Sequence, residues 1–143
     1  MGVVKATQKD IETLARLMRA EAEGEGKQGM LMVGNVGVNR VKVRCLDFKD
    51  INSIQRMVFQ SPGGFEATQK GYFYQGARQS EIKLAKKVIA GQRFHPAEFS
   101  LWFFKPPGAC PGQWFNQWNA GRFKSHCFYK PTEADCAGVY STF

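Results

Sequence analysis

The apolar positions near the start of the chain recur with the spacing of an α-helix. Four of them fall on one helical face: Ile11, Leu14, Leu17 and Met18. Thr7 and Asp10 have the spacing of a capping box, with Asp in place of the usual Glu. Gly24 and Gly26 follow the periodic stretch and favour its end. The pattern therefore predicts a helix over residues 8–22.

A second apolar stretch predicts a helix over residues 28–43. Gly34 and Gly37 lower its intrinsic helix propensity. We expect these glycines to allow close approach of a neighbouring backbone, with the first helix as the candidate neighbour. Asn39 and Arg40, near the end of this helix, are interpreted as a buried polar anchor and an ion-pair partner, not as catalytic groups.

The rest of the chain changes in character. Two further helices are predicted over residues 50–59 and 80–90, capped by Asp50 and Ser80. Residues 99–104 form a short extended run, and beyond them Gly, Pro and aromatic residues dominate, as in loops and short strands. Helices first and short β pieces later predict an α+β fold.

Length and charge narrow the range of functions. The chain has 143 residues, which suits one domain with a sizeable core, expected over residues 1–143. Gly, Asn or charged residues interrupt the longest apolar stretches, so we expect no transmembrane helix and no membrane partner. The net charge of +8 indicates an acidic partner, but Lys and Arg are spread along the chain, which argues against nucleic acid. Residues 1–8 lack the apolar run of a secretory signal.

The apolar face of the first helix leads directly into a carboxylate. Leu14, Leu17, Met18 and Glu21 share this face, so Glu21 is directed toward a site of low dielectric constant. Burial raises the pKa of a carboxyl group, and an acid still protonated near neutral pH can protonate a leaving oxygen. The alternative is a solvated acidic helix end, since three glutamates occur within residues 21–25. Glu21 is our candidate general acid.

A glycosidic bond is usually cleaved by two carboxyl groups, one as acid and one as nucleophile or base. Glu25 and Glu66 are the candidate second carboxylates. Glu25 could equally accept hydrogen bonds from backbone amides at the junction of the first two helices. Neither lies in a run as distinctive as that around Glu21, so a mechanism with one carboxylate also stays open.

Four segments together resemble a known family. They are residues 21–25 (EAEGE), 33–40 (VGNVGVNR), 64–67 (GFEA) and 125–128 (SHCF). In this order they resemble the SleB/CwlJ family of spore cortex-lytic cell-wall hydrolases, and the match is closest to the CwlJ branch. The resemblance covers about residues 7–143.

The resemblance implies a lysozyme-like α+β fold in which a glutamate near a helix end faces a sugar-binding groove. It assigns the catalytic role to Glu21, and SleB-type relatives are lytic transglycosylases, while simple hydrolysis also stays open here. The implied substrate is cortex peptidoglycan containing muramic-δ-lactam. The implied location is the boundary of spore coat and cortex, reached from the mother cell without a signal peptide. Calcium dipicolinate as activator and a coat protein as partner are further implications; no cofactor or metal is expected.

Aromatic side chains supply stacking surfaces for sugar rings. The candidate substrate-binding residues are Phe65, Tyr72, Tyr74, Trp102, Trp114 and Trp118. Residues 114–118 (WFNQW) form the best cluster, because amides alternate with aromatics in a loop-prone region. Each of these aromatics could instead belong to the core. His126 is included as a hydrogen-bonded residue near the groove floor.

Two other functions stay open. A thiol amidase or peptidase could use Cys127, but the adjacent His126 would point to the opposite face of a strand, so His95 or a rearranged loop would be needed. The positive charge also fits a non-catalytic module that binds wall polymer or nucleic acid. The four cysteines contain no C-x-x-C pair, and two states stay open for them: buried free thiols, or disulfides formed by oxidation in a spore coat.

Overall fold

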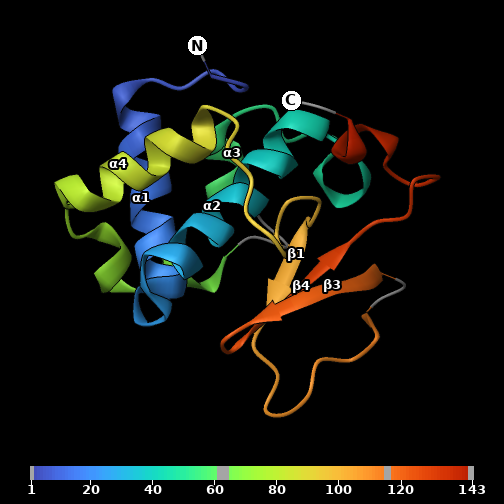
Figure 1. Ribbon diagram of the computed structural model, residues 1–143. Coiled ribbons are helices and arrows are strands. Elements are labelled where there is room, and N and C mark those ends of the chain that lie inside the picture. The colour runs from blue at the N-terminus through green and yellow to red at the C-terminus, as the bar shows by residue number, and fades with distance from the viewer. Residues whose placement is uncertain (1, 61–64, 115–116, 142–143) are drawn as a thin grey trace.

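Helices and strands occupy separate parts of the molecule (Figure 1). The computed structural model describes residues 2–60, 65–114 and 117–141. The helices described are α1 (Gln8–Ala22), α2 (Gly26–Val43), α3 (Ile54–Val58) and α4 (Gln79–Ile89). The strands are β1 (Trp102–Phe104), β2 (Gln113–Trp114), β3 (Gln117–Phe123) and β4 (His126–Lys130). Short 3₁₀ turns connect them: η1 (Glu23–Glu25), η2 (Leu46–Phe48), η3 (Glu66–Gln69), η4 (Gly71–Tyr74) and η5 (Ala137–Tyr140).

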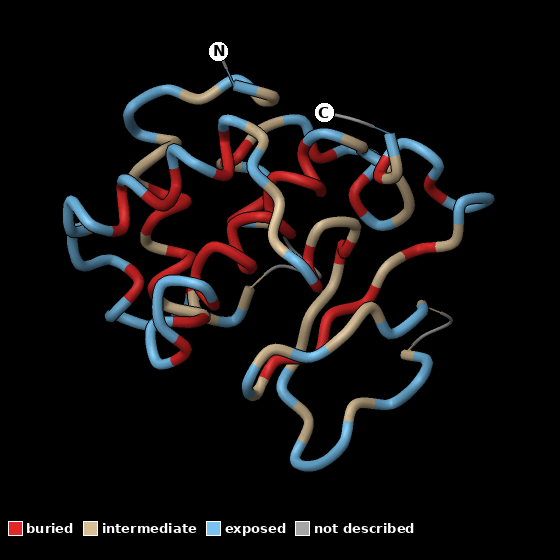
Figure 2. Tube along the Cα trace, viewed as in Figure 1, coloured by how far each residue is buried: buried red, intermediate tan, exposed pale blue. Residues whose placement is uncertain are grey.

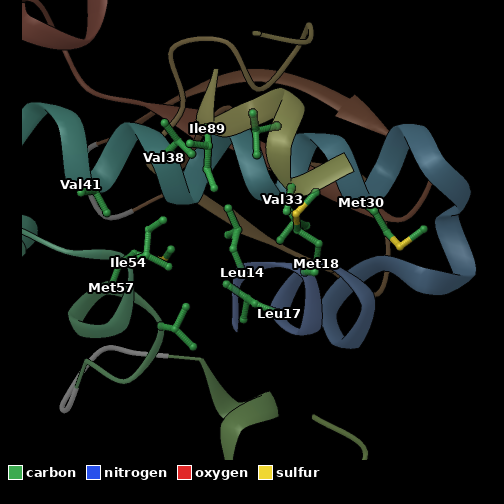
Figure 3. Close-up of a cluster of buried hydrophobic side chains, with 14 of the residues drawn as sticks. Leu14, Leu17, Met18, Met30, Val33, Val38, Val41, Ile54, Met57 and Ile89 are labelled. Carbon is green, nitrogen blue, oxygen red and sulfur yellow. The ribbon is translucent and has the colours of Figure 1, made fainter. Parts of the chain in front are cut away.

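Helix α1 begins and ends where the sequence predicts. The Thr7 hydroxyl accepts a hydrogen bond from the Asp10 amide, and the Asp10 carboxylate accepts one from the Thr7 amide. This reciprocal pair is the predicted capping box, and it satisfies two amides that the first helical turn leaves unpaired. Leu14, Leu17 and Met18 of the predicted apolar face are buried against the other helices (Figures 2 and 3), and Ile11 is half-buried at its start.

Two glycines bring α2 close to its neighbours. A β-carbon at Gly34 would lie 2.9 Å from the side chains of Met18 on α1 and Val88 on α4. A β-carbon at Gly37 would lie 2.8 Å from the terminal methyl of Met57 on α3. The glycines do allow close approach, and the first helix is one of three neighbours, but side chains approach them and not a neighbouring backbone as predicted. Figure 3 shows Met18 and Met57 within this packed layer.

Helices α3 and α4 begin at other residues than predicted. Ser53, not Asp50, caps α3 by accepting a hydrogen bond from the Arg56 amide. The chain at Asp50 is still turning out of η2, so no helix can begin there. Helix α4 begins at Gln79, before the predicted cap Ser80, because the Glu81 carboxylate reaches back to the amide of Arg78.

An antiparallel sheet follows the helices, with strand order β1-β4-β3-β2. Phe128 on β4 packs with Met32 and Val36 of α2 and with Ala97, and this small cluster joins the sheet to the helices. The arrangement is the predicted α+β fold. Of the described helices, none combines the length and apolar character needed to cross a membrane.

All four cysteines are paired in disulfides. Cys45 is bonded to Cys136, 91 residues away, and Cys110 to Cys127, 17 residues away. Of the two states left open by the sequence, the structure has the disulfide-bonded one, because the fold brings each pair to Cα separations of 5.9 and 5.8 Å. The first disulfide joins the residues after α2 to those before η5, and the second joins the β1–β2 loop to β4.

Candidate active site

Glu21 lies in the last turn of α1, at the end of its buried face. Leu14, Leu17 and Met18 on that face are fully buried, and Glu21 itself is half-buried. Within the described part of the chain, no protein donor makes a hydrogen bond to its carboxyl group, which stays available to a ligand.

Electrostatics around Glu21 favour a proton-carrying acid. Burial raises the pKa of its carboxyl group above the ordinary value. The positive charges of Lys105 and Arg40 oppose this shift, and the negative charge of Glu66 adds to it. Because the net pKa is raised, a larger fraction of Glu21 carries a proton near neutral pH than in an exposed glutamate. This is the state that a general acid needs.

Glu25, four residues further on, has its carboxylate fully engaged with the protein. Its Oε1 lies 2.5 Å from Nδ1 of His126, and its Oε2 accepts hydrogen bonds from the amide and hydroxyl of Ser125. The side chain of Lys124 donates to the Glu25 carbonyl at 3.0 Å. Burial alone would raise the pKa of Glu25, but these hydrogen bonds outweigh burial and lower it. Glu25 therefore ties the β3–β4 turn to the α1–α2 junction and is a poor candidate for the second carboxylate.

Glu66 is the other candidate second carboxylate, and its side chain makes no hydrogen bond or ion pair with the described residues. It is exposed at the start of η3, and its charge acts on Glu21. Residues 61–64, which include the first residue of the GFEA segment, lie outside the described residues.

Asn39 and Arg40 anchor the end of α2 to the segment before the sheet. The Asn39 amide donates to the carbonyls of Glu98 at 3.1 Å and Ser100 at 2.9 Å, as predicted for a buried polar anchor. The Arg40 Nε donates to the Leu101 carbonyl at 2.7 Å. These bonds set the start of β1 against α2.

The buried side chain of Arg19 holds residues 72–76, which include the end of η4, against α1. Its guanidinium donates to the carbonyls of Gly76 at 2.8 Å, Gln75 at 2.6 Å and Tyr72 at 3.1 Å. These three bonds fix the segment containing η4 against α1; side chains two residues apart on a helix do not face each other, so this clamp lies on another side of α1 than Glu21. Sequence reasoning did not identify this clamp, since its acceptors are backbone carbonyls with no sequence signature.

The aromatic candidates Phe65, Tyr72 and Tyr74 differ in their surroundings. The Phe65 ring contacts the Arg40 guanidinium at 4.8 Å. Tyr72 and Tyr74 are 41 % and 55 % exposed, so both present ring surface to a ligand. Their hydroxyls bond to Glu23 and to the Thr68 carbonyl, which fixes both rings.

The candidates of the sheet differ in exposure. Trp102 packs on Phe48, and Trp114 stacks on Phe104 with 4.6 Å between ring centroids. Trp118 is 47 % exposed on β3, while residues 115–116 between the two tryptophans lie outside the described residues. His126 is buried and bonded to Glu25, so it supports the hairpin and offers little surface to a substrate.

Two features bear on the other chemistries considered. Cys127 is bonded to Cys110, so the structure provides no thiol nucleophile there, and the Cys127 peptidase alternative is wrong for the oxidised protein. Across residues 2–60, 65–114 and 117–141, no group of three or more His, Cys, Asp or Glu side chains is placed to hold a metal ion.

Sequence comparisons identify the relatives of this chain. The model of a family described as Cell Wall Hydrolase matches residues 24–129. The cell wall hydrolase CwlJ of Halalkalibacterium halodurans is 68 % identical over 143 residues, covering all of both chains. The cell wall hydrolase CwlJ of Bacillus subtilis is 59 % identical over 143 residues, again covering all of both chains.

Solved structures share the fold. The catalytic domain of the Bacillus cereus SleB protein has a TM-score of 0.71 and 24 % identity, covering 90 % of this chain and 96 % of that one. The catalytic domain of the germination-specific lytic transglycosylase SleB from Bacillus anthracis has a TM-score of 0.66 and 25 % identity, covering 87 % and 97 %. With the matches in sequence, these structures show that the chain is a lytic enzyme of the cell wall and belongs to the cell wall hydrolase family.

Proposed function

We propose that this enzyme cleaves glycosidic bonds of spore cortex peptidoglycan during germination, with Glu21 as general acid and then general base. The observation that carries the proposal is the state of Glu21: half-buried, raised in pKa and without a hydrogen bond from the described residues. The description of the Bacillus anthracis relative as a germination-specific lytic transglycosylase supports it.

In the first step, the protonated Glu21 carboxyl donates its proton to the glycosidic oxygen, and the bond from that oxygen to the anomeric carbon breaks. Glu21 is left as a carboxylate. In the second step this carboxylate accepts a proton from the hydroxyl that attacks the anomeric carbon. If the attacking group is the C6 hydroxyl of muramic acid, the product is a 1,6-anhydro sugar; if it is water, the product is a reducing end.

Attack by the sugar hydroxyl needs one carboxylate, and attack by water commonly uses two. Glu66 would supply the second carboxylate in a hydrolase, because it is exposed and its charge acts on Glu21. The engagement of Glu25 with Ser125 and His126 favours the scheme with Glu21 alone.

For substrate binding, we assign the exposed rings of Tyr72, Tyr74 and Trp118 to stacking on sugar faces. The net charge of +8 suits the carboxylates of peptidoglycan stem peptides. Binding of muramic-δ-lactam, location at the coat–cortex boundary, activation by calcium dipicolinate and placement by a coat protein complete the proposal. They rest on the family resemblance, and the proposed chemistry needs no cofactor.

The test is a mass-spectrometric profile of muropeptides released from cortex fragments of decoated spores. Wild type, Glu21→Gln and the exposed control Glu133→Gln are compared. We expect new glycan products from wild type and control, and none from Glu21→Gln. Anhydro masses identify a transglycosylase and reducing ends a hydrolase. Undiminished cleavage by Glu21→Gln would overturn the mechanism, and absence of cleavage by wild type with binding intact would favour a wall-binding module.

A further inference from the structure

We propose that Tyr72 is a second contact for the glycan strand, away from Glu21: its ring is a fixed platform for one sugar, and Glu23 is the positioning residue that holds it. The inference rests on the proposed function, since it takes glycan as the ligand and deepens the assignment of Tyr72 to sugar stacking. It also gives Glu23, the middle glutamate of residues 21–25, a role apart from the chemical step.

Five side chains from three parts of the chain form a closed network around Tyr72. The Tyr72 hydroxyl donates to Oε1 of Glu23 at 2.5 Å, and Nη2 of Arg78 donates to Oε2 of the same carboxylate at 2.5 Å. Arg78 also forms an ion pair with the buried Glu81, whose Oε1 lies 3.6 Å from Nη1 of Arg19. The network closes where the Arg19 guanidinium lies over the Tyr72 ring, with 4.7 Å between its central carbon and the ring centroid. Each partner of Tyr72 is therefore itself held by another partner.

The network leaves one face of the Tyr72 ring open to a ligand. Arg19, which covers the other face, is 3 % exposed, and its guanidinium also donates to the Tyr72 carbonyl. Since Tyr72 is still 41 % exposed, its exposed surface belongs to the uncovered face and the ring edge. A flat apolar face with a polar edge suits the C–H face of a sugar. A ring that is already fixed also loses little conformational entropy when it binds.

The surroundings of the ring favour a sugar over a protein partner. Glu23 and Arg78 border the hydroxyl end of the ring, and their side chains are 40 % and 59 % exposed. The core of a protein–protein interface is instead apolar and depleted of charged residues. Within residues 2–60, 65–114 and 117–141, Nη1 of Arg78 makes no hydrogen bond to a protein acceptor, so it can donate to a sugar hydroxyl. A sugar, with apolar faces and hydroxyls around its rim, matches this surface.

The platform lies on another side of α1 than the candidate acid. Arg19, which covers the Tyr72 ring, precedes Glu21 by two residues, and side chains at this spacing on a helix do not face each other. Because a glycan strand is a polymer, it can contact the enzyme both at the bond that is cleaved and at a sugar further along. We therefore expect Tyr72 to contribute to holding the strand and not to the cleavage step.

The hydrogen bond between Tyr72 and Glu23 persists across the neutral pH range. The bonds from Tyr72 and Arg78 lower the pKa of Glu23, so its carboxylate is charged at neutral pH. The same bond raises the pKa of Tyr72, so its hydroxyl keeps the proton that it donates.

The experiment measures binding to insoluble cortex peptidoglycan by cosedimentation, with every variant made in Glu21→Gln to prevent cleavage. Tyr72→Ala should weaken binding about 3- to 10-fold, as for the loss of one stacked aromatic contact. The control is Phe59→Ala, which removes a ring of similar exposure, 44 %, outside the network and should bind like the parent. Melting temperatures check that each variant is folded. If Tyr72→Ala does not fold, Tyr72→Leu carries the same test, since it covers Arg19 without an aromatic face.

A double-mutant cycle tests the positioning role of Glu23. Glu23→Ala should weaken binding about 2- to 3-fold, and it should have no further effect once Tyr72 is Ala, because Glu23 acts through the ring. The matched control is Glu12→Ala, which removes another ion-paired glutamate of similar exposure and should bind like the parent. Additive effects of Glu23→Ala and Tyr72→Ala would overturn the positioning role.

Kinetics on solubilised cortex glycan, with Glu21 intact, separate binding from chemistry. Tyr72→Ala should raise KM and leave kcat unchanged. A lower kcat with an unchanged KM would overturn the inference, and so would undiminished binding of Tyr72→Ala or an equal loss in Phe59→Ala. If Glu21→Gln is inactive and Tyr72→Ala binds like its parent, only the inference fails. If Glu21→Gln cleaves as fast as wild type, the proposed function itself fails.

Discussion

The end of α1 and the 3₁₀ turn that follows it carry two glutamates with opposite environments. Glu21 is half-buried, has a raised pKa, and receives no hydrogen bond from the described residues. Glu25 is buried more deeply, yet its pKa is lowered, because Ser125 and His126 donate to it. Burial disfavours the charged form of both carboxyl groups, and at Glu25 the hydrogen bonds from Ser125 and His126 outweigh this effect.

The sheet creates this difference. The β3–β4 turn delivers Ser125 and His126 to Glu25 from 100 residues away in the chain. Glu21 makes no such hydrogen bond; its pKa is instead influenced by the charges of Lys105, Arg40 and Glu66. One carboxylate holds the sheet on the helices, and the other is left free for chemistry.

The largest expected effect is on catalysis. Glu21→Gln removes the proton donor and should lower the cleavage rate by about 10²–10⁴-fold, the contribution typical of a general acid–base group. The variant should fold normally, because no hydrogen bond of the described protein is lost. Rates are compared at equal concentrations of folded protein, with Glu133→Gln as control. If Glu21→Gln is folded and fully active, Glu21 is not the catalytic acid, and the assignment of different roles to Glu21 and Glu25 is contradicted.

The complementary change acts on stability. Glu25→Ala leaves the Ser125 amide and His126 without their acceptor and should lower the free energy of unfolding by about 2–3 kcal/mol. Denaturant unfolding measures this, with Glu133→Ala as the exposed control. Cleavage per folded molecule should change far less than in Glu21→Gln. Unchanged stability with a ~10³-fold loss of activity would instead make Glu25 a catalytic group.

The close packing of α2 against α1 and α4 at Gly34 provides a third test. Ala normally stabilises a helix relative to Gly, but a β-carbon at Gly34 would lie 2.9 Å from Met18 and Val88. Gly34→Ala should therefore destabilise the protein by about 1–3 kcal/mol through overpacking. The control is Gly71→Ala, where a β-carbon meets no atom within 4 Å. A gain in melting temperature for Gly34→Ala would show that α1 and α2 can separate without cost.

The smallest expected effect is the pH dependence of stability. The raised pKa of Glu21 makes folding less favourable as pH rises from about 4.5 through the folded-state pKa, so Glu21→Gln should be more stable than wild type above that range and equally stable below it. The lowered pKa of Glu25 works in the other direction. Its stabilisation is present above about pH 4.5 and is lost as pH falls through its folded-state pKa. Unfolding curves between pH 2 and 8 check both signs, and parallel curves for wild type and both variants would contradict them.

Local sequence patterns predicted what depends on local interactions. The capping box and apolar spacing predicted α1 with its bounds, and the order of patterns predicted the α+β class. The position of Glu21 at the end of the apolar face was also predictable, because helical periodicity alone places it there. The start of α3 was not, since Asp50 and Ser53 are both good caps and the preceding turn decides between them.

Contacts between segments far apart in the sequence could not be predicted from local sequence patterns. The pairing of Cys45 with Cys136 and the bonds of Glu25 to Ser125 and His126 join segments about 90 to 100 residues apart. No spacing rule within either segment reveals its partner. The effect of Lys105 on Glu21 is of the same kind, since an exposed lysine after a strand has no signature in the sequence.

The central claim is that Glu21 is held as an acid and Glu25 as a structural carboxylate. The most direct test follows both side-chain carboxyl carbons by ¹³C NMR during a pH titration, with the resonances assigned through Glu21→Gln and Glu25→Gln. We predict an apparent pKa above the ordinary 4.5 for Glu21 and below it for Glu25. Two ordinary values, or the reverse order, would contradict the account.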